Sequence, residues 1–313
     1  MKKNILFLSL IFLLISMSNA QDIVLSKEIL KFYQEKEKIT SMWSETINSK
    51  NPEKIKETID AYKAFYNLKY PQNRYDHTYL NYADLLAKYG NLKEAVIYYE
   101  LAFNTKSMLP TAFLYQYRKD FFKKDTVLYQ KTLERFKKQF AQIYSYDEIE
   151  ILQKLREIFS ADQMAREYHS EHSNYRNCAA SIIIFADTIH VAKIKELFDT
   201  GLDVASIFYY DFELAFVLGR HLFTAYPDFW LTYFEPTARQ NLIEGRNGPQ
   251  NYARTYDRAI ITSGRAAYSY YGEWDNNGKN ENPDTELVNR RRANLGLKPL
   301  GEEKIENKVF ITY

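Results

Sequence analysis

Apolar residues recur every three to four positions along most of this chain, which is the spacing of one face of an α-helix. Residues 26–48 show the spacing first, with Ile29 and Phe32 at its start. Asn51-Pro52 then supplies an N-cap and a first-turn proline for the next helix. The same pattern predicts further helices at residues 147–172, 187–198, 211–225, 229–243, 249–264 and 285–294. The expected fold class is therefore mostly α.

Residues 79–102 carry the clearest signal for paired helices. Two helical segments meet at Gly90-Asn91, and Ala83 and Ala95 are small where paired helices approach closely. This pattern resembles a tetratricopeptide repeat, which places about 34 residues in two helices. One repeat cannot bury its own apolar face, so we expect tetratricopeptide-like helical hairpins over residues 21–145. A helical hairpin that does not repeat is the alternative.

The pattern changes near residue 145, and we expect a second helical domain over residues 146–313 whose first helix is capped by Asp147. Alternating aromatics at 266–274 precede a strong turn, and the tail at 308–313 has strand-like composition. This domain should therefore contain at most a small β element. The apolar run at 179–186 is too short to cross a membrane, so we expect it to be buried.

The first twenty residues have the order of a secretory signal peptide. Lys2 and Lys3 precede an apolar run over residues 5–15, and small or polar residues lead to a cleavage site after Ala20. A membrane anchor is the competing interpretation, but it needs about 20 apolar residues. A lipoprotein would need a cysteine after the cleavage site, and the single cysteine is Cys178. We expect an exported protein, periplasmic or secreted, without lipidation or stable membrane insertion after cleavage.

Composition narrows the function further. The chain has 42 Lys and Arg against 40 Asp and Glu, and loss of Lys2 and Lys3 with the signal peptide would leave it formally neutral. Neutrality argues against a nucleic-acid partner. One cysteine allows no internal disulfide, so a packed core must stabilise the fold.

One helical segment carries residues with chemical potential. Asp162, Arg166 and His169 are spaced i, i+4 and i+7, so they share a helix face that is able to bind an anion or transfer a proton. An ordinary surface ion pair is the simpler interpretation. His169 and His172 lack the spacing of a zinc motif, and no phosphate-binding loop or nucleophile elbow is present. We expect no metal site and no cofactor.

Residues from about 148 to 300 resemble a bacterial domain of unknown function. The resemblance lies in three pieces, which are Asp162-Gln163-x-x-Arg166, the apolar helix around His221, and Tyr256-Asp257-Arg258 followed by Tyr271-Gly272 and Val288-Asn289-Arg290-Arg291-Arg292-x-x-x-Gly296-Leu297. The chain departs from this pattern between Arg166 and His221, where an asparagine and glycine linker is hard to place. It also has Tyr271-Gly272-Glu273 where the pattern has Tyr-Gly-Thr.

The resemblance implies that the matched polar residues meet. They would line one polar pocket formed by Asp162, Gln163, Arg166, His221, Asp257, Arg258 and Tyr271. The alternative is a buried network of hydrogen bonds and ion pairs that joins helices without binding a ligand. The domain of unknown function has no established activity, so the resemblance implies none for this chain.

The sequence favours an exported protein-interaction or scaffold module of the bacterial cell envelope over an enzyme. Its protein partner would bind through the helical-repeat surface. A glycan-binding envelope protein is the alternative, suggested by the aromatic segment 268–274, and exposed coplanar rings would favour it. A hydrolase that uses His221 or His169 with a carboxylate is the second alternative, and a histidine and an aspartate within hydrogen-bond distance would favour it.

Overall fold

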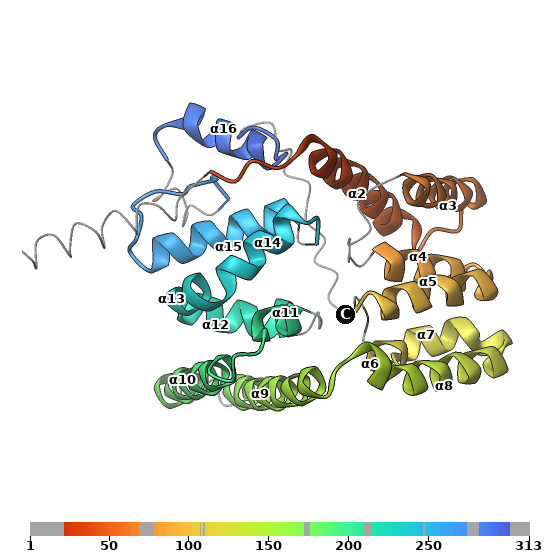
Figure 1. Cartoon of the computed structure of the whole chain (residues 1–313), viewed down its shortest axis with the longest axis horizontal. Coiled ribbons are helices and arrows are strands. Elements are labelled where there is room, and N and C mark those ends of the chain that lie inside the picture. Colours follow the sequence, from red (N-terminus) through yellow and green to blue (C-terminus); the bar gives the residue numbers. More distant parts are fainter. Residues whose placement is uncertain are drawn as a thin grey trace, which may run out of the picture.

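The chain folds into packed helices, as the periodicity predicts (Figure 1). A computed structural model describes residues 22–68, 78–106, 108, 110–171, 176–209, 214–246, 248–273 and 282–300. Within these ranges the chain has helices and turns but no strand, which confirms the mostly α fold class. The expected signal peptide at residues 1–20 and the strand-like tail at 308–313 lie outside the described residues.

The first half of the chain forms a stack of helices. Ser26 caps the first of them, and Asn51 caps the second by accepting from the backbone N–H of Glu53 at 3.0 Å. Proline at the first helical position completes the start that the sequence predicts there. The elements are α2 (Lys27–Thr46), α3 (Pro52–Asn67), α4 (Thr78–Lys88), α5 (Leu92–Asn104), α6 (Pro110–Phe113), α7 (Gln116–Phe121), η1 (Phe122–Lys124) and α8 (Thr126–Ile143).

The second half begins with two long helices and continues with shorter ones. Two single turns of π-helix interrupt the shorter helices, and the second of these ends where Pro236 enters the next helix. The elements are α9 (Tyr146–Glu171), α10 (Arg176–Phe198), α11 (Val204–Tyr209), η3 (Leu214–Leu218), α12 (Gly219–Ala225), α13 (Pro227–Phe229), η4 (Trp230–Phe234), α14 (Glu235–Ile243), α15 (Pro249–Thr262) and α16 (Thr285–Asn294).

Helices α4 and α5 form a tight hairpin. Gly90 joins them with a φ of 92°, a backbone conformation that side chains with a Cβ rarely adopt. Ala83 and Ala95 are fully buried, so their small side chains allow the two helices to approach closely. Tyr62 of α3 stacks on Tyr82 of α4 with ring centroids 4.8 Å apart, which continues the packing to the neighbouring helix.

The two ends of the described chain meet, so the helices follow a closed path in which α16 lies beside the start of α2 (Figure 1). The backbone N–H of Leu25 donates to the carbonyl of Asn294 at 3.1 Å. The Tyr33 hydroxyl on α2 donates to the carbonyl of Leu242 at the end of α14, at 2.7 Å. One continuous set of buried apolar side chains extends through both halves. The halves therefore contact each other at two places, through the ion pair of Lys106 with Glu148 on α9 and through α2.

Several local expectations change. Ser145 caps α9, because its hydroxyl accepts from the N–H of Glu148 while the Glu148 carboxylate accepts from the N–H of Ser145. Asp147 instead lies in the first turn of α9. Residues 266–273 form bends and turns, and the rest of that segment lies outside the described residues. In the described part of the chain, no helix combines the length and apolar character needed to cross a membrane.

A buried ion pair connects α4 and α7, and nothing in the sequence pattern predicted it. The Arg118 guanidinium donates to both carboxylate oxygens of Asp84, at 2.8 and 2.9 Å. The Tyr99 hydroxyl of α5 donates to the same carboxylate at 2.6 Å. Arg118 is only 3% exposed, so water does not screen this pair.

Candidate functional site

A cluster of charged side chains lies where α9, α10 and α12 pack together. Asp162 and Arg166 are one turn apart on α9, while Asp187 and His190 are one turn apart on α10. His221 comes from α12, three residues after the π-helical turn η3 ends at Leu218. Because residues three or four apart share a helix face, each helix directs its pair toward the same junction.

Asp162 is the centre of the cluster and is only 1% exposed. Its Oδ2 atom lies 2.8 Å from Nδ1 of His221 and accepts from the amide of Gln163 at 2.8 Å. Its Oδ1 atom accepts from Nε of Arg166 at 3.0 Å. Burial by itself would raise the pKa of this carboxyl, but the hydrogen bond and charge of His221 together with Arg166 hold it below its ordinary value. Asp162 is therefore a buried carboxylate with paired charges.

Arg166 joins the two long helices. It contacts Asp162 through Nε, and its Nη2 atom donates to Oδ1 of Asp187 at 2.7 Å. Burial raises the pKa of Asp187 above the usual range, and the nearby Asp162 adds to the rise, although the charge of Arg166 partly offsets it. One guanidinium thus pairs with two buried carboxylates on neighbouring helices.

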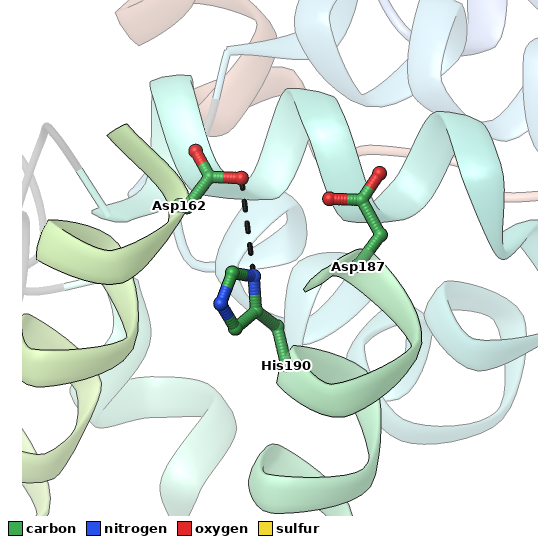
Figure 2. A group of neighbouring side chains, drawn as sticks. All are labelled: Asp162, Asp187 and His190. Atoms are coloured by element: carbon green, nitrogen blue, oxygen red, sulfur yellow. Dashed lines mark ion pairs between the residues drawn. The ribbon is translucent and has the colours of Figure 1, made fainter. Parts of the chain in front are cut away.

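His190 is the more deeply buried of the two histidines in the cluster. It is 4% exposed, and its Nδ1 atom lies 4.0 Å from Oδ1 of Asp162 (Figure 2). That separation is too long for a hydrogen bond. Among the described residues, Nδ1 of His190 has no hydrogen-bond partner. Burial lowers the pKa of His190, which favours the neutral imidazole.

The Asp162 and His221 pair has the geometry of an acid–base couple. A buried carboxylate that accepts from Nδ1 fixes the ring orientation and directs the second nitrogen, Nε2, to accept a proton. The His221 side chain is 23% exposed and Arg166 is 24% exposed, so both reach solvent while Asp162 does not. The arrangement is chemically able to move a proton next to a fixed positive charge.

Asp257 of α15 belongs to a second, separate network. Its carboxylate is fully buried and accepts from the backbone N–H groups of Tyr270 at 2.8 Å, Tyr271 at 2.9 Å and Glu273 at 2.9 Å. The Ser269 hydroxyl donates to it at 2.5 Å. Burial raises the pKa of Asp257, and these hydrogen bonds oppose the rise. The carboxylate therefore holds the 269–273 loop against α15.

Arg292 of α16 secures the other side of that loop. It is fully buried and donates to the carbonyl of Tyr271 at 2.9 Å and to the carboxylate of Glu273 at 2.8 Å. Its Nε atom donates to the carbonyl of Lys298 at 2.6 Å. Asp257 and Arg292 thus connect α15, the loop and α16, which is a structural role for two residues of the resemblance motif.

The seven residues expected to share one pocket fall into three places. Asp162, Gln163, Arg166 and His221 meet at the charged cluster, whereas Asp257 and Tyr271 belong to the loop network. Arg258 lies on α15, where burial and the charge of Arg220 lower its pKa. Arg220 immediately precedes His221, so Arg258 lies on the side of α15 that faces α12.

Two residues of the cluster were missed as a pair by sequence reasoning. Asp187 is the first residue of the helix predicted at residues 187–198, and His190 lies within that helix. Their spacing of three residues places both on one face of α10, which was the available signal. A spacing of that kind occurs on many helices, so only the position of α9 gives it meaning.

The same α9–α10 hairpin exposes apolar side chains. Ile184 is 65% exposed and Phe185 is 68% exposed, so the expectation that this apolar run is buried is wrong for both residues. Other exposed apolar residues of the hairpin are Met164 and Tyr168 on α9 and Ile182 and Ile189 on α10. The Arg166–Asp187 ion pair joins the two helices here, so the exposed apolar residues of α9 lie at the same height along the hairpin as those of α10.

Comparison with family models, with curated proteins and with solved structures finds no match to this chain.

Proposed function

We propose that the protein is an exported interaction module that binds a protein partner through the apolar surface of the α9–α10 hairpin. The observation that carries this proposal is the row formed by Ile182, Phe185 and Ile189, all exposed and spaced i, i+3 and i+7 along α10. Clusters of exposed large apolar residues are typical of interaction sites. This contact surface lies on α10, outside the helical repeats at residues 21–145 that the sequence suggested as the binding surface.

The chemistry of the row indicates the kind of partner. Residues at i, i+3 and i+7 form one stripe of a helix, which is the surface that a second amphipathic helix packs against. The chain is formally close to neutral, so long-range charge contributes little to the recognition. The partner is therefore a protein that offers an amphipathic helix with its own apolar stripe.

The helical scaffold supports this role. The α4–α5 hairpin, with Gly90 at its turn and buried Ala83 and Ala95 at its seam, is consistent with a tetratricopeptide-like array in the first half. The closed path of the helices, through the contact of Leu25 with Asn294, would hold α9 and α10 in a fixed position. Pre-organised contact surfaces lose less entropy when they bind.

The test uses chemical cross-linking in the host cell envelope, followed by reconstitution with the purified partner. Phe185→Glu should abolish capture of a partner that the wild-type chain retains. Ile97→Glu places the same charge on an exposed apolar position of α5, away from the α9–α10 hairpin, and should capture the partner normally. Equal capture by both variants would refute the proposal. Self-association of the purified chain through Phe185 would also refute it, because the occupant would then be a second copy.

Export is tested separately by the mass of the protein recovered from the periplasm or the culture medium. Cleavage after Ala20 predicts a chain that begins at Gln21. A recovered chain that keeps the first twenty residues would contradict the signal-peptide interpretation.

Glycan binding has weaker support, because Tyr271 is buried and the rings of Tyr270 and Tyr271 meet at 73° instead of lying coplanar.

An acid–base enzyme is the second candidate function, favoured by the 2.8 Å contact between Asp162 and His221. Hydrolysis of p-nitrophenyl acetate and bis(p-nitrophenyl) phosphate would probe it with an ester and a phosphodiester. His221→Gln should remove any activity, while His169→Gln on the same face of α9 should keep it. Rates equal to those of buffer, or unchanged in His221→Gln, would dismiss this candidate.

A further inference from the structure

Three possible metal-ligand atoms lie close together at the α9–α10 junction. Asp162, Asp187 and His190 each offer one atom, and all three atoms lie within 4.8 Å of one another. All three residues are buried, so bulk water is largely excluded from the three atoms. Figure 2 shows the His190 ring turned toward Asp162, with the Asp187 carboxylate beside it on the same helix as His190.

The position of His190 is the observation that points beyond an ion-pair network. Its Nδ1 atom is buried, lies 4.0 Å from Oδ1 of Asp162, and makes no hydrogen bond within the described part of the chain. A buried polar atom without a partner costs about 1–3 kcal/mol. Two ligands that bind one ion at about 2.1 Å lie roughly 3–4 Å apart. The Nδ1–Oδ1 separation is at the upper end of that range.

The protonation states suit a cation. Burial favours a neutral His190, which leaves a lone pair on the ring, and Asp162 remains ionised because its pKa is lowered. Metal ligands must be deprotonated in this way. Burial raises the pKa of Asp187, and a divalent ion beside its carboxylate would favour the ionised form.

Arg166 supplies the positive charge that pairs with the two carboxylates in this structure. Its guanidinium contacts Oδ1 of both Asp162 and Asp187, which are the atoms that face the junction. Its side chain is long and 24% exposed, so it is able to turn outward without unfolding the helix. Arg166 would therefore compete with a metal ion for the two carboxylates.

We propose that Asp162, Asp187 and His190 bind one first-row divalent transition-metal ion, such as Zn²⁺ or Mn²⁺, when Arg166 turns outward. One imidazole with two carboxylates favours these ions over Mg²⁺ and Ca²⁺, which prefer oxygen ligands alone. His221 contacts the other oxygen of Asp162 and thereby orients this ligand. This metal site and the apolar contact surface are independent of each other. Three protein ligands would leave one coordination position of the ion open.

The experiment uses the full chain without a histidine tag, stripped of metal with EDTA and titrated with Co²⁺ as a visible probe. We expect one Co²⁺ per chain and absorption bands of a four- or five-coordinate ion. Asp187→Asn and His190→Gln should each weaken binding by more than the roughly 10–100-fold that outer-sphere changes cause. His169→Gln is the matched control on α9 and should bind normally. Arg166→Gln should bind more tightly because it removes the competing charge.

Absence of Co²⁺ binding at millimolar concentration would overturn the proposal. Binding that survives His190→Gln but is lost in His169→Gln would also overturn it, because the ion would then sit on surface histidines. X-ray absorption of the wild-type chain loaded with Zn²⁺ gives an answer even where a variant fails to fold. One imidazole in the ligand set supports the site, and two or more imidazoles contradict it.

Discussion

Replacement of Arg118 by methionine should be among the most destabilising single changes in the first half of the chain. The substitution keeps much of the side-chain volume but leaves the Asp84 carboxylate buried without its charge partner. Both guanidinium contacts, at 2.8 and 2.9 Å, disappear together. Removal of one partner from a buried ion pair costs about 3–5 kcal/mol, because the remaining charge has neither water nor a counter-ion. We expect a loss of that size in the free energy of unfolding of Arg118→Met.

The double variant Asp84→Leu with Arg118→Met separates this cause from a simple packing defect. Removing both charges eliminates the buried unpaired carboxylate, and apolar replacement of buried ion pairs is often nearly neutral. The Tyr99 hydroxyl then loses its acceptor, which costs about 1–3 kcal/mol. The double variant should therefore be more stable than Arg118→Met alone, by about 2 kcal/mol.

Guanidinium unfolding followed by circular dichroism, applied to the wild-type chain, Asp84→Leu, Arg118→Met and the double variant, completes one double-mutant cycle. Arg135→Met is the matched control, because Arg135 pairs with Glu100 at the surface, where its side chain is 51% exposed. Surface pairs contribute about 0–1 kcal/mol, so the control should stay close to wild type. A cost below about 1 kcal/mol for Arg118→Met, or strictly additive losses in the cycle, would refute the reasoning.

Three further predictions concern pH, the loop network and a glycine. Burial raises the pKa of Tyr209 to about 12, whereas an unfolded tyrosine ionises near 10. The native state therefore keeps a proton that the unfolded state loses, so its stabilising contribution is complete below pH 10 and falls between pH 10 and 12 by about 1.4 kcal/mol per unit. Alkaline unfolding followed by circular dichroism tests this, and a pH-independent stability in that window would contradict it. Asp257→Ala should release the 269–273 loop, which hydrogen exchange would detect as faster exchange of its amides, and unchanged protection would count against the anchoring role. Gly272→Ala should destabilise the fold by about 1–3 kcal/mol, because its φ of 71° is strained for alanine and the new Cβ would lie 2.8 Å from Leu300. A melting temperature equal to that of wild type would reject this last expectation.

Periodicity and capping residues located most helices and several of their ends. The Asn51-Pro52 start and the turn at Gly90 were both predicted from local chemistry, because caps and left-handed turns depend on a few neighbouring residues. The start of α9 was placed at Asp147 instead of Ser145, since two polar residues close together both suit a cap. Two neighbouring N-cap candidates differ little in free energy, so the local sequence does not show which of them caps the helix.

The site was only partly accessible from the sequence. Asp162, Arg166 and His221 were singled out, and the structure brings them together, but Asp257 was placed in the same pocket and in fact anchors a loop. A motif shows that residues belong to a pattern, and it does not show which of them touch. His190 had no role in the predicted pocket, because its three-residue spacing from Asp187 gains meaning only when α9 packs beside α10.

The sequence by itself determined the helical class of this protein, because the 3.6-residue period, the caps and the few glycines act within a few residues of chain. The tertiary structure alone decided that Asp84 meets Arg118, that Asp162 meets His221, and that Phe185 faces solvent. These outcomes depend on how helices far apart in the chain pack against each other. Each helix face offers many packing partners of similar composition, and only the complete set of contacts selects one of them.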